Sequence, residues 1–232
     1  MKNKIPLLMD RFMPSFRLFF WNHLHIGAKA YMLCFHDVSE SEDNFAIHRE
    51  DYYSIILRIK EKIVRIDDIR NSGIVISFDD GYASLYDTVL PFMEAQELPF
   101  VCYITTGFLD TPGYLTKQQL IELSKSKWCT IGSHMCTHSR TRELSKDRIE
   151  NEWAESKRLL EKITMKSVLH AALPYGSYNA CTFKSKKIAL KVGYKTVADT
   201  IAVPFAPKSR IISRFVYQKN NSRVAELIET LK

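Results

Sequence analysis

Short apolar runs alternate along the chain with segments in which apolar residues recur every three or four positions. The short runs are rich in β-branched and aromatic residues and predict buried strands at 31–35, 74–78, 100–105, 129–133, 168–173 and 194–198. The longer segments predict helices at 83–96, 117–125, 146–163, 181–191 and 223–231. Strands that alternate with helices are typical of a parallel sheet with crossover helices. The pattern therefore predicts an α/β fold.

Two local signals refine the helices. Ser145 precedes the longest helical segment and is expected to be its N-cap, whereas Pro91 is expected to weaken the helix at 83–96 near its end. About six parallel strands can form either an open doubly wound sheet or a barrel. Neither GxGxxG nor GxxxxGK[ST] occurs. Because these motifs bind the phosphates of nucleotides, their absence disfavours an open sheet of the nucleotide-binding type. We find no linker or repeat in the 232 residues and expect one barrel domain over 31–232, preceded by an N-terminal extension at 1–30.

Composition excludes several other classes. Hydrophobic residues make up 46% of the chain and charged residues 25%, which is ordinary globular usage and unlike disordered, collagen-like or coiled-coil chains. The five cysteines include no CxxC pair, and most lie in apolar runs, so we interpret them as reduced thiols. Residues 5–9 form too short an apolar stretch for a signal-peptide core, and we expect a cytoplasmic protein. The aromatic, basic segment at 16–21 either packs on the domain or associates with a membrane surface.

The net charge of +7 is concentrated in one tract. Residues 184–219 hold nine Lys or Arg and a single acid, Asp199. Such a tract indicates either an anionic partner, such as a phosphate or an acidic glycan, or a solvated face. No nucleic-acid-binding signature accompanies it, so we expect no nucleic-acid partner.

Residues with catalytic or metal-binding side chains follow several of the predicted strands. Asp79-Asp80-Gly81 follows the strand at 74–78, where it offers either a pair of active-site carboxylates or an N-cap for the next helix. His134 and His138 follow the strand at 129–133, four residues apart. Two such histidines and a carboxylate from another strand are typical of a metal site that keeps positions open for water and substrate. A structural Cys2His2 site with Cys129 and Cys136 and simple core or surface histidines are the alternatives.

Two further strand ends carry weaker signals. Pro174-Tyr175-Gly176 closes the strand at 168–173, and such a turn can direct a backbone N–H toward an oxyanion. His36-Asp37 closes the strand at 31–35, where the imidazole either acts in acid–base chemistry or simply ends a core strand. Because strand ends meet at one rim of a barrel, the four motifs are expected to gather there.

The four motifs together resemble the polysaccharide deacetylase family, also known as NodB-homology domains or carbohydrate esterase family four. The resemblance covers roughly residues 31–214, and it rests mainly on Ser-Phe-Asp-Asp-Gly and Ser-His-x-x-Thr-His, which stand in this order about 50 residues apart. It implies an irregular (β/α)7-type barrel. It also implies a hydrolase that removes N- or O-acetyl groups from glycans with one divalent metal ion, Zn²⁺ in most members.

The resemblance assigns a role to each matching position. It implies that Asp79 is the catalytic base and that Asp80, His134 and His138 bind the metal. The Tyr175 amide would stabilise the oxyanion, with Pro174 and Tyr175 contacting substrate. The catalytic histidine of most members lies near the C-terminus, but no histidine follows His170 here. The matching segment is 33–37, as in a circularly permuted subgroup that includes poly-N-acetylglucosamine deacetylases.

That permutation would make His36 the catalytic acid, opposite Asp79, and place Leu33 against the acetyl methyl group. Two departures from the family pattern are evident. Many members carry an arginine that orients the base where this chain has Ala172, and the family's Asp–Trp segment is missing. Asp199 is then the acid expected to orient His36.

The expected activity is removal of N-acetyl groups from an N-acetylhexosamine-containing glycan or a phosphate-containing precursor of one. Three alternatives remain open from the sequence: a deacylase or deformylase of a lipid-linked sugar, one of a nucleotide-linked sugar, and a member that binds glycan without catalysis. Peripheral membrane association through residues 1–30 would suit a lipid-linked substrate.

Overall fold

The computed structural model describes residues 30–69, 71–220 and 223–230. The N-terminal extension expected at 1–30, and with it the membrane-contacting segment at 16–21, therefore lies outside the described residues except for Ala30. Within the described part, no helix is both long enough and apolar enough to cross a membrane.

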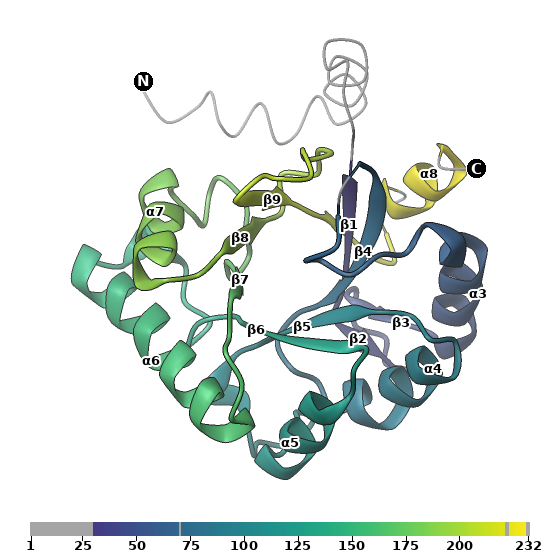
Figure 1. Cartoon of the computed structure of the whole chain (residues 1–232), viewed down its shortest axis with the longest axis horizontal. Coiled ribbons are helices and arrows are strands. Elements are labelled where there is room, and N and C mark those ends of the chain that lie inside the picture. The colour runs from purple at the N-terminus through teal and green to yellow at the C-terminus, as the bar shows by residue number, and fades with distance from the viewer. Residues whose placement is uncertain (1–29, 70, 221–222, 231–232) are drawn as a thin grey trace.

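The strands form a nearly closed parallel barrel with helices around it (Figure 1). Eight segments pair in the order β10-β1-β4-β5-β6-β7-β8-β9, every neighbouring pair being parallel. Their bounds are β1 Ala30–Phe35, β4 Gly73–Phe78, β5 Phe100–Ile104, β6 Cys129–Ser133, β7 His170–Ala172, β8 Thr196–Asp199, β9 Ile211–Ser213 and β10 Phe215–Val216. The predicted α/β barrel is confirmed.

The seam of the barrel is closed by the last two segments. β9 pairs with β8 and β10 pairs with β1, yet only Arg214 separates β9 from β10 in the chain. Taken as one interrupted strand, they join the two ends of the sheet and give seven strands around the barrel. Arg214 consequently lies where the last strand leaves β8 and joins β1.

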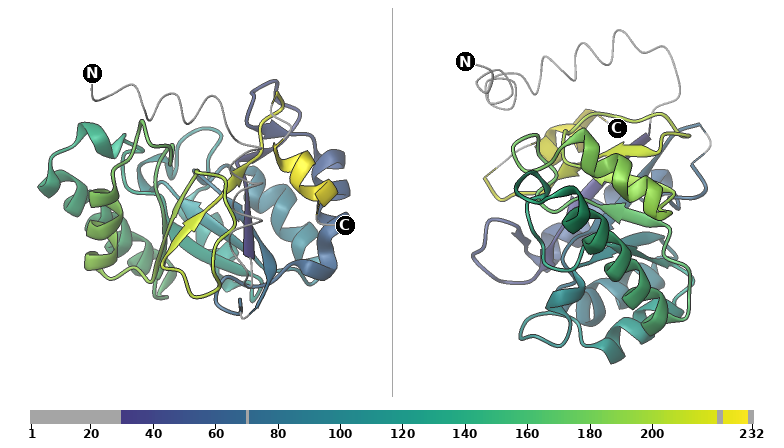
Figure 2. Two further views of the ribbon diagram at one scale, coloured as in Figure 1. Left: turned by 90° about the horizontal axis from the view of Figure 1, so that it is seen from above. Right: turned by 90° about the vertical axis from the view of Figure 1, so that its left-hand side faces the viewer.

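Helices surround the barrel and cover its outer face. The α-helices are α3 Arg49–Ile59, α4 Leu90–Ala95, α5 Lys117–Lys125, α6 Lys146–Thr164, α7 Phe183–Val192 and α8 Arg223–Thr230. Short 3-10 turns lie at Lys60–Lys62, Thr106–Phe108 and Thr141–Glu143, and β2 (Asp37–Val38) pairs with β3 (Ala46–Ile47) outside the barrel. α8 lies beside α3 in Figures 1 and 2, with Arg58 2.5 Å from Glu229, so the last described helix packs next to the first.

Alternate residues of each strand face two different apolar layers. On β1, Leu33 and Phe35 belong to the larger core shared with the helices, whereas Ala30 and Met32 belong to a smaller core with Val75 and Tyr103. This period of two follows from the pleat of a strand. It determines which side chains can reach the site inside the barrel.

Several predicted elements need correction. The structure adds α3 and the short strands β2, β3, β9 and β10 to the predicted set. It also divides the helix expected at 83–96 into a π-helical turn, Leu85–Val89, followed by α4. The helical backbone continues through Val89 and Leu90, and the Leu90 N–H donates to Leu85 O, five residues back. Pro91 follows this π-helical turn directly, so the regular hydrogen-bond pattern is lost next to the proline, as expected. Ser145 is confirmed as the N-cap of α6 and accepts a hydrogen bond from the Arg148 N–H.

Candidate active site

The carboxyl ends of the strands surround one cleft of about 430 Å³. His36 follows β1, Asp79 and Asp80 follow β4, and His134 and His138 follow β6, and all five line this cleft. Tyr175 reaches it from the turn after β7. Parallel strands end at the same rim of a barrel, which explains why His36 and Tyr175, 139 positions apart, meet there.

The turn after β4 holds both carboxylates in the wall of the cleft. Asp79 continues the sheet, since its N–H donates to Phe35 O at 3.0 Å, and the chain then bends sharply at Asp80 (φ 70°) and Gly81 (φ 95°). The side chains of Asp79 and Asp80 are only 5% and 10% exposed. Neither caps the helical turn that follows, so the N-cap interpretation does not apply.

Asp79 is held by a fully buried arginine. Arg214 donates to both carboxylate oxygens of Asp79, from Nη1 at 2.5 Å and from Nη2 at 2.8 Å. Burial by itself would raise the pKa of Asp79, but the Arg214 guanidinium, together with His134, keeps it well below its usual range. Asp79 is therefore an ionised carboxylate in a fixed orientation. The orienting arginine that the sequence lacks at position 172 comes instead from the seam of the barrel.

Asp80, His134 and His138 form a separate group. Oδ1 of Asp80 lies 3.5 Å from Nε2 of His134 and 3.2 Å from Nε2 of His138, and one ligand atom from each residue lies within 4.8 Å of the others. Burial lowers the pKa of His134 to about 4 against the opposing charges of Asp79 and Asp80, so this imidazole is neutral near pH 7. A neutral imidazole is the form that binds a metal.

The donor set fits a divalent metal ion. His134 Nδ1 lies 2.8 Å from Ala172 O and donates its proton there, which leaves Nε2 as an acceptor facing Asp80. Oδ1 of Asp80 is buried and accepts no hydrogen bond from the described residues. Two histidine nitrogens and one carboxylate, one histidine being fixed through its second nitrogen, are typical of zinc sites. Cys129 is not part of this group: its sulfur faces Cys102, 3.9 Å away, so the Cys2His2 alternative is not supported.

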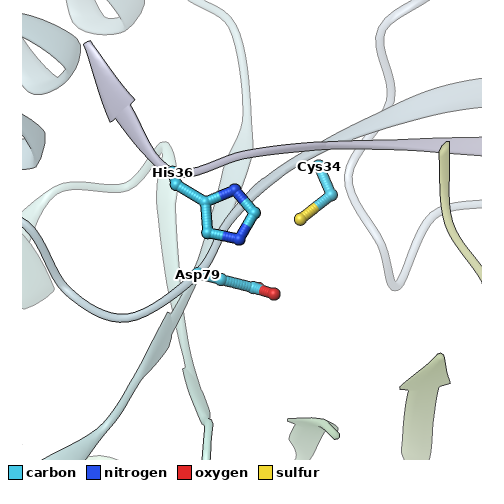
Figure 3. Close-up of side chains that lie close together, drawn as sticks. All are labelled: Cys34, His36 and Asp79. Carbon is cyan, nitrogen blue, oxygen red and sulfur yellow. The ribbon is translucent and has the colours of Figure 1, made fainter. Parts of the chain in front are cut away.

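His36 lies beside Asp79, not opposite it as expected. A nitrogen of its ring lies within 4.8 Å of the Asp79 carboxylate and of the Cys34 sulfur, and Figure 3 shows the ring turned toward Asp79. Burial lowers the pKa of His36, while the charges of Asp79 and Asp80 oppose the shift. The residue expected to orient it, Asp199, instead pairs with Lys186 and accepts from Ser213 Oγ at 2.7 Å. Asp199 therefore belongs to a separate buried ion pair.

The turn after β7 brings Tyr175 to the cleft, with its side chain 48% exposed. Tyr175 has a φ of 62°, and no described residue accepts a hydrogen bond from its backbone N–H. Its ring centroid lies 4.7 Å from that of His138, and the guanidinium carbon of Arg140 lies 4.3 Å from the centroid of the Tyr175 ring. The amide of Tyr175 is thus available to a ligand.

Two residues expected to contact substrate do not line the cleft. Pro174 instead supports the turn, because its carbonyl accepts from Gly176 N at 2.7 Å and from Cys181 Sγ at 3.4 Å. Leu33 is fully buried in the core between strands and helices. The alternation of β1 explains the error for Leu33: Cys34, one position later, faces the interior near Asp79.

Comparison with known proteins identifies the family. The family model described as polysaccharide deacetylase matches residues 68–197, more than half of the chain. The chain belongs to the polysaccharide deacetylase family. Membership implies a hydrolase that removes acyl groups from carbohydrate. The matched segment contains Asp79, Asp80, His134, His138 and Tyr175, whereas His36 and Arg214 lie outside it.

Two curated relatives of this polysaccharide deacetylase share part of its sequence. The deacetylase-family protein YxkH of Bacillus subtilis (strain 168) is 23% identical over 192 residues, which cover 78% of this chain and 67% of YxkH. The poly-beta-1,6-N-acetyl-D-glucosamine N-deacetylase of Escherichia coli (strain K12) is 28% identical over 113 residues, 41% of this chain. That match spans only 17% of the E. coli protein.

Solved structures share the fold of this polysaccharide deacetylase. IcaB from Ammonifex degensii superimposes with a TM-score of 0.77 at 19% identity, covering 88% of this chain and 97% of that one. A de-N-acetylase from Aggregatibacter actinomycetemcomitans gives 0.73 at 17% identity, covering 86% and 99%. These similarities establish the barrel along nearly its whole described length.

Proposed function

We propose that this protein is a metal-dependent deacetylase that removes N-acetyl groups from an N-acetylhexosamine-containing glycan. The observation that carries the proposal is the pairing, in one cleft, of a metal-binding group with an ionised carboxylate that an arginine orients. The E. coli relative acts on poly-N-acetylglucosamine, which supports an amino-sugar polymer as the substrate class.

Asp80, His134 and His138 would hold the ion, with Zn²⁺ the expected metal because the donors are nitrogen and oxygen atoms of the types it prefers. A divalent ion at that position lowers the pKa of water and polarises a carbonyl group. The protein residues around it then carry the proton transfers and stabilise charge.

Asp79 is the proposed base. Its carboxylate is ionised and fixed by Arg214, and it lies 3.6 Å from His134 Nε2, next to the metal-binding group. It would accept the proton of the water that attacks the acetyl carbonyl. The unpartnered N–H of Tyr175 would donate to the oxygen on which negative charge develops.

His36 is the proposed acid. Expulsion of an amine from an amide requires protonation of the nitrogen, and the His36 ring lines the same cleft as Asp79 and Tyr175. Since His36 lies on the same side as Asp79, the proton taken from water and the proton given to the leaving nitrogen would move through adjacent groups.

Aromatic side chains support a sugar substrate. Tyr82 lines the cleft and stacks on Tyr114 with ring centroids 4.8 Å apart, and Phe45 lies 4.8 Å from the His36 ring. Rigid aromatic surfaces beside a few polar groups are typical of small-molecule and sugar sites.

The test is acetate release from N-acetylglucosamine oligomers by the zinc-loaded protein. We expect release by the natural sequence, and a loss of about 10²–10⁴-fold in Asp79→Asn and in His36→Ala, as for a missing acid or base. The His36→Ala protein should lose much less activity on an activated acetate ester, whose leaving group needs little protonation. Oligomer binding without any acetate release would instead support the glycan-binding alternative.

A further inference from the structure

A second group of potential metal ligands lies at the ends of β1 and β4. It consists of Cys34, His36 and Asp79, whose ligand atoms lie within 4.8 Å of one another, as they do in the group around Asp80. Figure 3 shows the His36 ring turned toward the Asp79 carboxylate, with the Cys34 sulfur beside it. No other set of three His, Cys, Asp or Glu side chains within the described ranges meets in this way.

Two of these three side chains have unused ligand atoms. The Cys34 thiol is fully buried, and its contacts with acceptors are weak ones, to Phe35 O at 3.7 Å and to the Asp79 carboxylate beside it. Neither ring nitrogen of His36 has a hydrogen-bond partner among the described residues, and Figure 3 shows Nε2 on the side of Asp79, with the buried Nδ1 turned away from it. Burial raises the pKa of Cys34 well above its usual value, so the thiol is protonated in the absence of an ion.

Asp79 can also contribute, although Arg214 already binds it. Arg214 uses one lone pair on each carboxylate oxygen, and each oxygen keeps a second. An ion between Asp79 and His36 would therefore not require the arginine to leave.

We propose that Cys34, His36 and Asp79 form a second, weaker site for thiophilic divalent ions such as Zn²⁺, Co²⁺ or Cd²⁺, and that its occupancy inhibits the protein. Thiolate and imidazole together favour such ions over Mg²⁺ or Ca²⁺. Binding would form a bond from sulfur to the ion and release the thiol proton to solvent. The Arg214 guanidinium and an ion held by Asp80 both add positive charge nearby, so the second site fills only when metal is in excess.

The inhibitory part of this inference rests on the proposed function. There, Asp79 accepts a proton from water and His36 gives one to the leaving nitrogen. An ion bound to both occupies the lone pairs that those transfers need. The binding part does not depend on any activity.

Cobalt titration of the apoprotein tests the site directly. The first equivalent should occupy Asp80, His134 and His138 and produce no thiolate-to-cobalt charge-transfer band in the near ultraviolet. A further equivalent should produce that band and bind at least about tenfold more weakly than the first. Absence of the band in the natural sequence at saturating cobalt would overturn the proposal.

Variants then assign the sulfur. Cys34→Ser and Cys34→Ala, each checked for folding by thermal melting, should bind the first equivalent and lack the band. Cys129→Ser is the matched control, because the sulfurs of Cys129 and Cys102 lie 3.9 Å apart and form the alternative thiol site. A band that survives both Cys34 changes, or disappears only in Cys129→Ser, contradicts the assignment.

Inhibition by excess Zn²⁺ is the second measurement. The activity of the natural sequence and of Cys34→Ser is expressed relative to the activity of the same protein with one equivalent of Zn²⁺. The Zn²⁺ concentration that halves this activity should be at least about tenfold higher for Cys34→Ser than for the natural sequence. A cobalt band without deacetylase activity in any variant would uphold the site and refute the proposed function. Inhibition that is equal in Cys34→Ser and the natural sequence would refute the inhibitory role.

Discussion

Asp79 and Asp80 are neighbours in the sequence but have different partners. Arg214 holds Asp79 by two hydrogen bonds, whereas Asp80 faces the nitrogens of His134 and His138. The left-handed backbone of Asp80 turns its side chain away from the arginine. These different environments are the reason for the proposed division of roles, proton transfer for Asp79 and metal binding for Asp80.

Exchanging each carboxylate for an amide should separate these roles. Asp79→Asn should retain the metal, because none of the three metal-binding residues changes. Asp80→Asn should lose metal affinity by at least about tenfold. Elemental analysis after dialysis against limiting zinc measures both variants, and the opposite pattern would reverse the two assignments.

Arg214 provides a prediction about stability and orientation. Arg214→Met leaves the buried Asp79 charge without its partner and should lower the free energy of unfolding by about 3–5 kcal/mol. Arg214→Lys keeps the charge but not the two-point contact, so we expect a smaller loss of stability and a loss of about 10²-fold in activity.

Chemical denaturation measures the stability, with Arg158→Met as the matched control. Arg158 forms an exposed pair with Glu155 at 2.8 Å, and its removal should leave the free energy of unfolding nearly unchanged. An equal loss in the free energy of unfolding for Arg214→Met and Arg158→Met would show that the buried Arg214–Asp79 pair does not stabilise the fold more than an exposed pair does.

The sequence predicts much of the site at this scale, with clear limits. Asp79, Asp80, His134, His138 and Tyr175 stand directly after apolar strands, so the barrel rim explains why they meet. Nothing near position 214 marks an arginine that contacts Asp79, 135 residues earlier. Leu33 faces the core shared with the helices and not the site, which the sequence does not show because a buried strand is apolar on both sides.

At the scale of elements, helix α6 supports the loop that carries the histidines. Glu152 on α6 is buried, and its Oε2 accepts from Cys136 N at 2.9 Å and from Thr137 N at 3.0 Å. Its Oε1 accepts from Thr137 Oγ1 at 3.0 Å. One carboxylate thus fixes the backbone between His134 and His138, the two histidines proposed to bind the metal.

Glu152→Ala should therefore weaken metal binding although Glu152 does not face the metal. It leaves two backbone N–H groups without acceptors, and we expect a loss of about 10–100-fold in zinc affinity, measured by competition with a chelator. Glu152→Gln retains one acceptor oxygen and should recover part of that loss. Glu155→Ala, on the exposed side of the same helix, is the control and should bind zinc like the natural sequence.

The elements that sequence analysis missed are short or distant from their partners. β9 and β10 have three and two residues, too few to show a period, and β10 pairs with β1 at the other end of the chain. Arg214 stands between these two strands, so a sequence that does not reveal the strands does not reveal the position of the arginine either. α3 did carry a signal: its buried residues Tyr52, Ile56 and Ile59 follow helical spacing.

At the scale of the whole molecule, closure of the barrel brings two buried carboxylates that repel each other to the same rim. The rim brings the buried carboxylates of Asp79 and Asp80 together, and the two hydrogen bonds of the Arg214 guanidinium to a carboxylate both go to Asp79. Among the described residues, Asp80 faces only the imidazoles of His134 and His138. Two extensive apolar cores account for folding without the metal, but the rim should be stabilised by a divalent ion.

Metal removal should therefore lower the melting temperature without unfolding the protein at room temperature. A ligand at about 100 times its dissociation constant stabilises the folded state by about 2.7 kcal/mol, which corresponds to roughly 5–10 °C for a protein of this size. Thermal melts with zinc and with excess chelator measure the difference. In His134→Ala/His138→Ala the two melts should coincide, because the ion has lost two of its three protein ligands. A zinc-dependent shift of equal size in the double variant would mean that the ion binds elsewhere, and the metal site at this rim would have to be abandoned.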